Sequence, residues 1–366
     1  MGDVLRSRGW KETDHDLDWD IIWADASWIR DVYDHVHLEP HQRVNHFRNH
    51  YELTRKDLLV KNLKRAKRLL VKEGYHDEAI KYDFFPKTFN LPGEYSLAKE
   101  SFYFRSSSPN SDGSATPPAE LYIVQQYISN PYLVGGKKFD MRVYVLVTNY
   151  SPLTVYLYRT GFARFSTSRF SMSNSHLQNN HIHLTNVAIQ KSAPKYDPKN
   201  GGKWSLRNLK LYLIGIWGQS RIDQLFYDIE LVIIRSLLAV RKVMINDKHS
   251  FELYGYDLLF DQQLKVWLLE VNAYPSLSAN TNDDYRMKFD LLDDMLTVID
   301  LERKLTGNEM QIGGFDLIYR HGLVEPDSND VVRTYLGCSN NRRENLSQLE
   351  RQRIGRRSSS DGRNNK

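Results

Sequence analysis

The chain has 366 residues, of which 41% are hydrophobic and 26% are charged, and its formal net charge is +5. This length suits one large domain or two to three packed ones, and the composition is that of a globular protein. The single cysteine, Cys338, excludes an internal disulfide framework and a cysteine-rich zinc site.

The positive charge favours an acidic partner, and charge alone leaves nucleic acid, an anionic membrane surface and an acidic protein tail open. The most apolar stretch, 225–245, is interrupted by five charged residues. This pattern predicts an amphipathic helix and no membrane span.

The first predicted element is a helix around residues 58–70, where five leucines interleave with the basic run 61–68. One face of this helix is basic, and that face either binds an acidic partner or is simply solvated. The segment 106–118 is dense in Ser, Pro, Asn and Gly and has no apolar periodicity. We therefore expect a flexible loop there.

The rest of the chain mixes predicted strands with predicted helices. Apolar residues at every second position indicate strands, whereas apolar spacings of three and four indicate helices. We expect strands at 121–128, 138–147, 153–158, 251–260 and 264–271, helices at 225–243 and 284–304, and a basic, partly helical or disordered tail from about residue 340. These elements predict an α+β fold with mainly antiparallel sheets flanked by helices.

Three oxygen-bearing side chains lie along the last predicted hairpin. With a two-residue turn at 262–263, Asp257 faces Leu268. Because side chains repeat every second residue, Asp257, Glu270 and Asn272 then share one face, with the two carboxylates as diagonal neighbours. Glu270 stands in an otherwise apolar run, where a carboxylate needs a partner. Such hard ligands favour magnesium, and the alternative is an edge-strand acid paired with an arginine.

A second polar group shares one face of the strand 138–147. Lys138, Asp140 and Arg142 alternate there with apolar residues. Lysine and arginine suit phosphate oxygens, and aspartate suits a ribose hydroxyl. The alternative is a solvated outer face of the sheet.

Histidines occur in pairs at 35/37, 46/50 and 181/183, and each pair has metal-ligating chemistry. No cysteine or third histidine with zinc-finger spacing accompanies them, so zinc is the weaker interpretation. A Ser-His-Asp arrangement and a G-x-S-x-G elbow are also absent from the sequence.

Several motifs in a consistent order resemble the tubulin tyrosine ligase-like family. The matching stretches are 46–56 (HFRNHYELTRK), 83–88 (DFFPKT), 127–145, 161–166 (GFARFS), 183–186 (HLTN), 254–257 (YGYD) and 267–273 (WLLEVNA). The resemblance covers Trp19 to Cys338, and the stretches 313–317 and 336–338 are most similar to a polyglutamylase of that family.

The resemblance implies an ATP-grasp fold and an ATP-dependent tubulin polyglutamylase. In such a reaction a glutamate carboxylate of the acidic tubulin C-terminal tail becomes an acyl phosphate, which the amine of free glutamate attacks. Glycine or tyrosine is the alternative donor. The family also implies partner subunits of a polyglutamylase complex and a location in the cytoplasm and cytoskeleton, at the axoneme or basal body of a cilium. It implies neither nucleic acid nor a membrane span.

The resemblance also assigns roles, motif by motif, to residues around one MgATP. The implied magnesium ligands are Asp257, Glu270 and Asn272, with Asp257 also contacting the nucleotide. The implied contacts of the nucleotide are Lys138, Asp140 at the ribose, and the hinge along the adenine formed by Gln125, Gln126, Tyr127 and Ile128. The implied catalytic residues are Arg142 and Arg164 at the γ-phosphate and acyl phosphate, and Thr185 and Asn186 near the transferring phosphoryl group.

The sequence departs from the family between Phe89 and Leu121, where such ligases carry a phosphate-binding lysine and a glycine-rich loop. Lys87 and Lys99 are nearby but lack the expected context. The resemblance therefore predicts an N-terminal subdomain at 1–90, a truncated central subdomain at 91–125, a C-terminal ATP-grasp subdomain at 126–338 and a basic tail at 339–366. The alternative to an active ligase is a catalytically inactive subunit that binds tubulin or the basal body, or an incomplete splice form.

Overall fold

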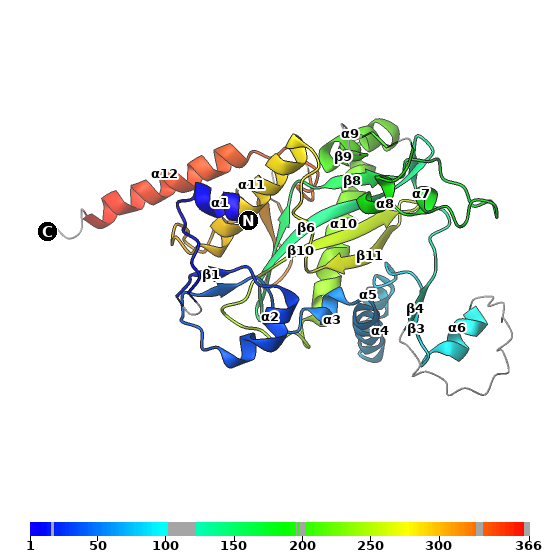
Figure 1. Cartoon of the computed structure of the whole chain (residues 1–366), viewed down its shortest axis with the longest axis horizontal. Coiled ribbons are helices and arrows are strands. Elements are labelled where there is room, and N and C mark those ends of the chain that lie inside the picture. Colours follow the sequence, from blue (N-terminus) through cyan, green and yellow to red (C-terminus); the bar gives the residue numbers. More distant parts are fainter. Residues whose placement is uncertain (16–17, 102–121, 195, 198–201, 327–331, 362–366) are drawn as a thin grey trace.

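The computed structural model describes residues 1–15, 18–101, 122–194, 196–197, 202–326 and 332–361. Figure 1 shows a long curved sheet flanked by helices, a small lobe that carries α6, and helix α12 extending from the opposite end. The predicted loop at 106–118 lies outside the described residues.

The strands are β1 Ile21–Ile22, β2 Arg43–Val44, β3 Thr88–Leu91, β4 Tyr122–Gln125, β5 Leu133–Val134, β6 Lys137–Tyr150, β7 Leu153–Tyr158, β8 Phe162–Phe165, β9 Lys203–Ser205, β10 Glu252–Phe260, β11 Val266–Asn272, β12 Gln311–Ile312 and β13 Phe315–Arg320. The helices are α1 Gly2–Ser7, α2 Ala26–Asp31, η1 Tyr33–His35, α3 Tyr51–Thr54, α4 Lys56–Lys72, α5 His76–Ile80, α6 Tyr95–Ser101, α7 Asn180–His183, α8 Val187–Gln190, α9 Leu206–Trp217, α10 Gln219–Val240, α11 Asn282–Ile299 and α12 Arg342–Asp361.

The fold is organised around β6, the longest strand. On one edge, β6 pairs antiparallel with β10 along residues 141–147. On the other edge, its first half pairs with β8 and its second half with β7. The main path of the sheet is β11-β10-β6-β7-β13-β12, with β5, β8 and β9 attached beside it. This arrangement confirms the predicted mixture of helices with mainly antiparallel strands.

The two faces of β6 explain why the sheet is covered on both sides. Met141, Val143 and Val145 pack into a core that includes α4, α9 and α10. Tyr144 and Leu146 point the other way, into a second core with α1 and α11. Toward the start of β6 this second face becomes polar, and there the second core ends and the candidate site begins. The predicted helices at 58–70 and 225–243 are confirmed as α4 and α10.

The loop between β10 and β11 is longer than predicted. It spans 261–265, because the carboxylate of Asp261 accepts hydrogen bonds from the backbone N–H groups of Gln263 and Lys265 at 2.9 and 3.0 Å. The predicted two-residue turn at 262–263 is therefore wrong.

The register of this hairpin also differs from the prediction. It shifts between Asp257 and Leu258, so that Asp257 lies directly opposite Glu270. Leu269 is the extra residue of a β-bulge. The predicted diagonal arrangement of the two carboxylates is wrong, but both do lie on the same face of the sheet.

The small lobe consists of β3, β4 and α6. β3 and β4 form an antiparallel sheet of two strands, separate from the main sheet. The strand predicted at 121–128 ends at Gln125: the N–H of Gln126 still bonds to the carbonyl of Lys87, and 126–128 are not part of a regular strand. A two-stranded sheet is marginally stable by itself, so this lobe depends on its contacts with the rest of the chain.

Two C-terminal predictions are corrected or confirmed in part. The helix expected at 284–304 is α11 and ends at Ile299, because Asp300 adopts a left-handed conformation with φ 56°. The basic tail forms α12, which extends to Asp361. None of the helices in the described ranges has both the length and the apolar character needed to cross a membrane.

Candidate functional site

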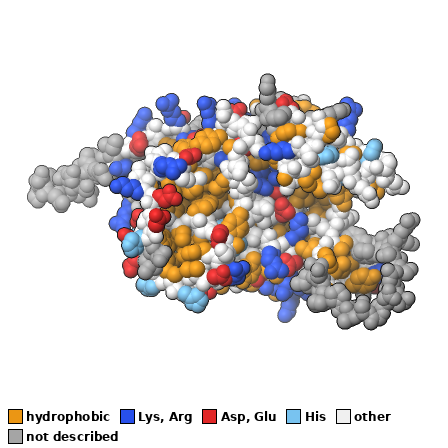
Figure 2. All heavy atoms as spheres, viewed as in Figure 1, with side chains coloured by type: hydrophobic (Ala, Val, Ile, Leu, Met, Phe, Trp, Pro, Cys, Tyr) orange, Lys and Arg blue, Asp and Glu red, His pale blue; other side chains and the backbone are white. Residues whose placement is uncertain are grey.

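A polar hollow of about 720 Å³ lies at the face of the sheet where β6, β8, β10 and β11 meet. Its walls also include the start of α4 and the segments around α7 and α8. Figure 2 shows basic and acidic side chains close together near the middle of this face of the molecule. The residues assigned by motif that line it are Gln125, Lys138, Asp140, Arg142, Arg164, Thr185, Asn186, Asp257, Glu270 and Asn272.

Two arginines and two aspartates form the floor of the hollow. Arg142 makes a bidentate pair with Asp257, at 2.5 and 3.0 Å. Arg164 pairs with Asp140 in the same way and also reaches Asp257 at 2.9 Å. Gly255 permits this packing, because a Cβ there would lie 3.2 Å from Cδ of Arg142.

The two arginines of this cluster favour the ionised form of Asp257. Burial opposes ionisation of Asp257, but the hydrogen bonds and charges of Arg142 and Arg164 outweigh it and lower the pKa of Asp257. Asp257 is only 4% exposed and Arg142 only 7%. The predicted polar face of β6 is therefore real, but the alternative of a solvated outer face is wrong.

Glu270 and Asn272 lie beside this floor and are more open to the hollow. The Asn272 amide nitrogen donates at 3.4 Å to both Asp257 and Glu270. Lys56, at the start of α4, approaches Glu270 to 3.5 Å. Glu270 keeps 44% of its side chain exposed. Because both oxygens of Asp257 already bind guanidiniums, Glu270 and the Asn272 carbonyl are the freer oxygen ligands for a hard cation.

Lys138 stands at the edge of the hollow and is 8% exposed. Its ammonium donates to the Tyr127 hydroxyl at 3.0 Å and to the His183 carbonyl at 2.8 Å. Burial lowers the pKa of Lys138 to about 8, although nearby Asp140 opposes this shift. The amine can therefore change charge close to neutral pH.

The four residues of the predicted adenine hinge do not line one common cavity. Gln125 lines the main hollow, whereas Gln125, Gln126 and Tyr127 together line an adjoining one of about 430 Å³ with Lys87. Ile128 is buried and lines neither. The structure thus brings the four residues to the junction of the small lobe and the main sheet without making them one surface.

The far wall of the hollow contains residues that the sequence analysis missed. Lys203 and Lys288 both pair with Asp284, at 3.0 and 3.2 Å. Tyr274 lies nearby, two residues after Asn272, and is 45% exposed. Lys56 is the last residue of the family motif 46–56, but the resemblance assigned it no contact with ATP or magnesium. Its place in that motif was the only available signal, because the three lysines are far apart in sequence.

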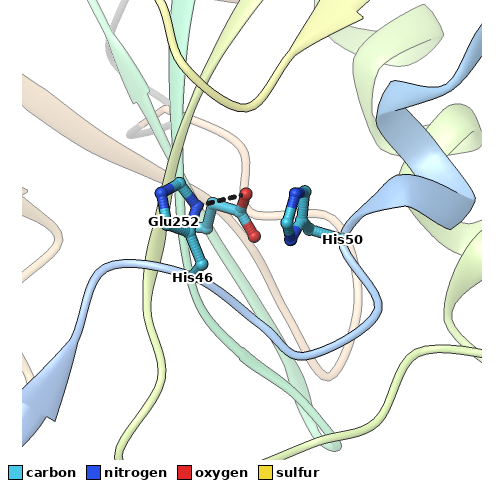
Figure 3. Close-up of side chains that lie close together, drawn as sticks. All are labelled: His46, His50 and Glu252. Carbon is cyan, nitrogen blue, oxygen red and sulfur yellow. Dashed lines mark hydrogen bonds and ion pairs between the residues drawn. The ribbon is translucent and has the colours of Figure 1, made fainter. Parts of the chain in front are cut away.

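One group in the described part of the chain has metal-ligating chemistry away from the hollow. Figure 3 shows His46 and His50 on either side of Glu252, with their candidate ligand atoms within 4.8 Å of one another. The Glu252 carboxylate accepts from Nδ1 of His46 at 2.9 Å, and also from the N–H of Phe47 and the hydroxyl of Tyr254. Both oxygens of this carboxylate therefore already accept hydrogen bonds from donors of the protein.

The orientation of Asn45 argues against a metal in this group. The Asn45 amide exchanges two hydrogen bonds with the backbone of Ala24, which fixes its Nδ2 toward Nε2 of His46 at 2.8 Å. Nε2 must then accept, so Nδ1 carries the proton and donates to Glu252. A metal on Nδ1 would move that proton against the Asn45 amide. We interpret the group as a structural network that ties the N-terminal segment to β10, in agreement with the weak prediction for zinc.

The sequence of the chain is similar to those of known proteins. The sequence model of the tubulin-tyrosine ligase family matches residues 35–111 and 108–306. Probable tubulin polyglutamylases TTLL9 of Rattus norvegicus and Bos taurus are 43% and 44% identical, over 95% and 97% of this chain and 90% and 91% of their own lengths. A probable alpha-tubulin polyglutamylase Ttll1 of Tetrahymena thermophila is 40% identical, over 87% of this chain and 90% of its own length.

The alignment with the rat protein is longer than this chain. The match to the rat protein runs over 416 positions, 50 more than the 366 residues of this chain, so at least that many positions face gaps in it. The two segments matched by the family model meet at residues 108–111. This junction falls within 89–121, the interval in which the sequence is expected to depart from the family.

Proposed function

The chain belongs to the tubulin-tyrosine ligase family, and we propose that it adds glutamate to glutamate side chains in the C-terminal tails of tubulin. The names of its relatives supply the acceptor and the added amino acid. The observation that carries the proposal within this chain is the cluster of Arg142, Arg164, Asp140 and Asp257 on the floor of a polar hollow. The guanidiniums of such a cluster, held in place by the two carboxylates, can donate hydrogen bonds to phosphoryl oxygens without any covalent nucleophile.

The proposed reaction has two steps. An oxygen of the acceptor carboxylate attacks the γ-phosphorus of ATP, ADP leaves, and an acyl phosphate remains. The amine of free glutamate then attacks the acyl carbon, phosphate leaves, the amine loses a proton and an isopeptide bond forms. In both steps negative charge develops on oxygens near the floor, where Arg142 and Arg164 are already oriented by their aspartates.

Magnesium fits the side of the hollow formed by β10 and β11. Glu270 and Asn272 would hold it, with Asp257 shared between the cation and the two arginines. The bound ion would neutralise the phosphates of ATP. Lys56 lies close enough to Glu270 to contribute a further positive charge there.

A second function has a specific observation in its favour. The family model matches the chain in two segments that meet at 108–111, and we propose that 91–125 is a remnant of a central subdomain that has lost its phosphate-binding lysine and glycine-rich loop. A chain without these two elements would hold ATP through half of its clamp. It would then serve as a tubulin- or basal-body-binding subunit of a polyglutamylase complex in cilia.

The pH dependence of nucleotide binding distinguishes a working half-site from a vestigial one. We expect ATP affinity to fall several-fold between pH 7 and 9, because Lys138, with a pKa of about 8, loses its positive charge in this range. Lys138→Arg keeps its charge throughout, so its affinity should be nearly constant over the same range. Titration calorimetry at several pH values measures both profiles, and a flat profile for the unmodified chain would contradict this role of Lys138.

The proposal is tested first by ATP binding in the presence and absence of magnesium. An active site of the kind described should bind ATP more tightly with magnesium, because Glu270 and Asn272 would hold the cation and the cation would neutralise the phosphates. A folded chain that binds neither ATP nor MgATP would eliminate the ligase for this form and leave the binding subunit.

A further inference from the structure

A chain of hydrogen bonds connects the start of β6 to α7 across the edge of the hollow. Lys138, on β6, donates to the hydroxyl of Tyr127 at 3.0 Å. The Tyr127 hydroxyl lies 2.8 Å from Nδ1 of His183, at the end of α7. Nε2 of His183 lies 3.1 Å from the carbonyl of His176. The three side chains come from three separate segments of the sequence.

The direction of every hydrogen bond in this chain is fixed. The carbonyl of His176 can only accept, so Nε2 of His183 carries the proton, and Nδ1 of a neutral His183 must accept from Tyr127. The Tyr127 oxygen is then left to accept from Lys138. Burial raises the pKa of Tyr127 to about 12, which keeps the proton on its hydroxyl at neutral pH.

The same residues hold the lysine in a second way. The backbone carbonyl of His183 accepts a further hydrogen bond from Lys138 at 2.8 Å. The ammonium also lies 4.5 Å from the centre of the Tyr127 ring, within cation–π distance. The Tyr127 and His183 rings meet edge to face at 5.5 Å, and Phe170 packs on His183 at 5.7 Å. The position of the amine is therefore determined from two sides.

An ammonium has three N–H donors, and protein acceptors take two of those of Lys138. Because Lys138 lines the hollow, the third donor is the one left for a ligand. We propose that Tyr127 and His183 are positioning residues that aim this third N–H of Lys138 at a phosphate oxygen of the nucleotide. The inference rests on the proposed function for the identity of the ligand, but not for the existence of the hydrogen-bonded chain.

The ligand-free protein provides the first test. In Tyr127→Phe the amine loses one acceptor, so its charged form is less stable and its apparent pKa should fall. Competitive acetylation of the free chain across pH 6–10, with Lys138 quantified by mass spectrometry, should show a lower midpoint in this variant. The charge of Asp140 and the carbonyl of His183 remain beside the amine in both proteins, so they do not produce the difference.

Tyr132→Phe is the matched control. Its hydroxyl accepts from Trp217 at 2.9 Å, and it lies in the same connection between β4 and β5, but the Lys138 ammonium donates to Tyr127 and His183 instead. An unchanged midpoint in Tyr127→Phe, or an equal change in Tyr132→Phe, overturns the proposal.

Nucleotides of different length provide the second test. Tyr127→Phe should weaken ATP and ADP by roughly five- to tenfold, the effect of one ordinary hydrogen bond, and leave adenosine unchanged. In a Tyr127→Phe background, His183→Ala should have little further effect, because the His183 ring acts on Lys138 only through the Tyr127 hydroxyl. Equal losses for ATP and adenosine would indicate a general structural defect and overturn the proposal.

The two tests distinguish the positioning of Lys138 from the proposed ATP-dependent function. A shifted acetylation midpoint in a chain that binds no nucleotide supports the positioning of Lys138 and contradicts the proposed ATP-dependent function. Nucleotide binding without any shift, and without discrimination by phosphate number, supports the function and contradicts the positioning chain.

Discussion

Glu270→Gln is expected to reduce magnesium-dependent ATP turnover by about 100-fold or more. The substitution removes one negative charge from the freest oxygen ligand of the hollow and keeps its shape. Loss of a metal ligand or of one preorganised electrostatic contact typically costs a factor of this size. Phosphate release in the presence of tubulin and glutamate, measured with and without magnesium, checks the result.

The stability of the chain should hardly change in Glu270→Gln. The side chain is nearly half exposed and its pair with Lys56 is long at 3.5 Å, so its contribution to folding is small. Glu78→Gln is a matched control, because Glu78 is 39% exposed and pairs with Arg235 and Lys81 away from the hollow. Turnover that survives in Glu270→Gln, or falls equally in Glu78→Gln, would show that Glu270 does not hold the metal.

Asp257→Asn is expected to affect both folding and catalysis. The buried Asp257 carboxylate neutralises Arg142 and Arg164 at once, so the neutral amide leaves two guanidiniums incompletely paired. Breaking a buried ion pair in this way costs about 3–5 kcal/mol of unfolding free energy. Denaturant titration followed by fluorescence measures this loss, and turnover per folded molecule should be abolished.

Asp316→Asn separates the two effects. Asp316 is buried and makes a bidentate pair with Arg159, but it lies outside the hollow. This variant should lose stability and keep its turnover per folded molecule. If Asp257→Asn behaves in the same way, the arginine–aspartate floor is structural and the proposed role of Arg142 and Arg164 in phosphoryl transfer is wrong.

The carboxylate site shows how far a strand pattern can lead. The predicted two-residue turn pairs Asp261 with Leu264. In the structure Asp261 stabilises a longer loop, which shifts the pairing of the two strands by one residue. Alone, this change would have placed Glu270 on the opposite face from Asp257. The bulge at Leu269 restores the common face. The grouping was therefore correct, but a pattern with a period of two contains no information about loop capping or bulges.

Contacts between distant segments were beyond the sequence. The polar face of β6 was predictable from alternation, but its burial depends on the segments around α7 and α8, which line the same hollow, and on Asp257 of the neighbouring strand β10. The approach of Lys56 to Glu270 joins the start of α4 to β11, and the contact of Tyr127 with His183 joins the segment after β4 to the end of α7. Such contacts follow from tertiary packing, which neither periodicity nor local propensity specifies.

The most direct test of the central claim is transfer of glutamate to tubulin by this chain. The full chain would be incubated with unmodified tubulin, ATP, magnesium and isotopically labelled glutamate, with labelled glycine and tyrosine in parallel, and the tail peptides analysed by mass spectrometry. We predict glutamyl additions on tail glutamates that require ATP and disappear in Glu270→Gln, without glycine or tyrosine transfer. A folded chain that binds tubulin and leaves its tails unmodified would contradict the ligase and support the binding subunit.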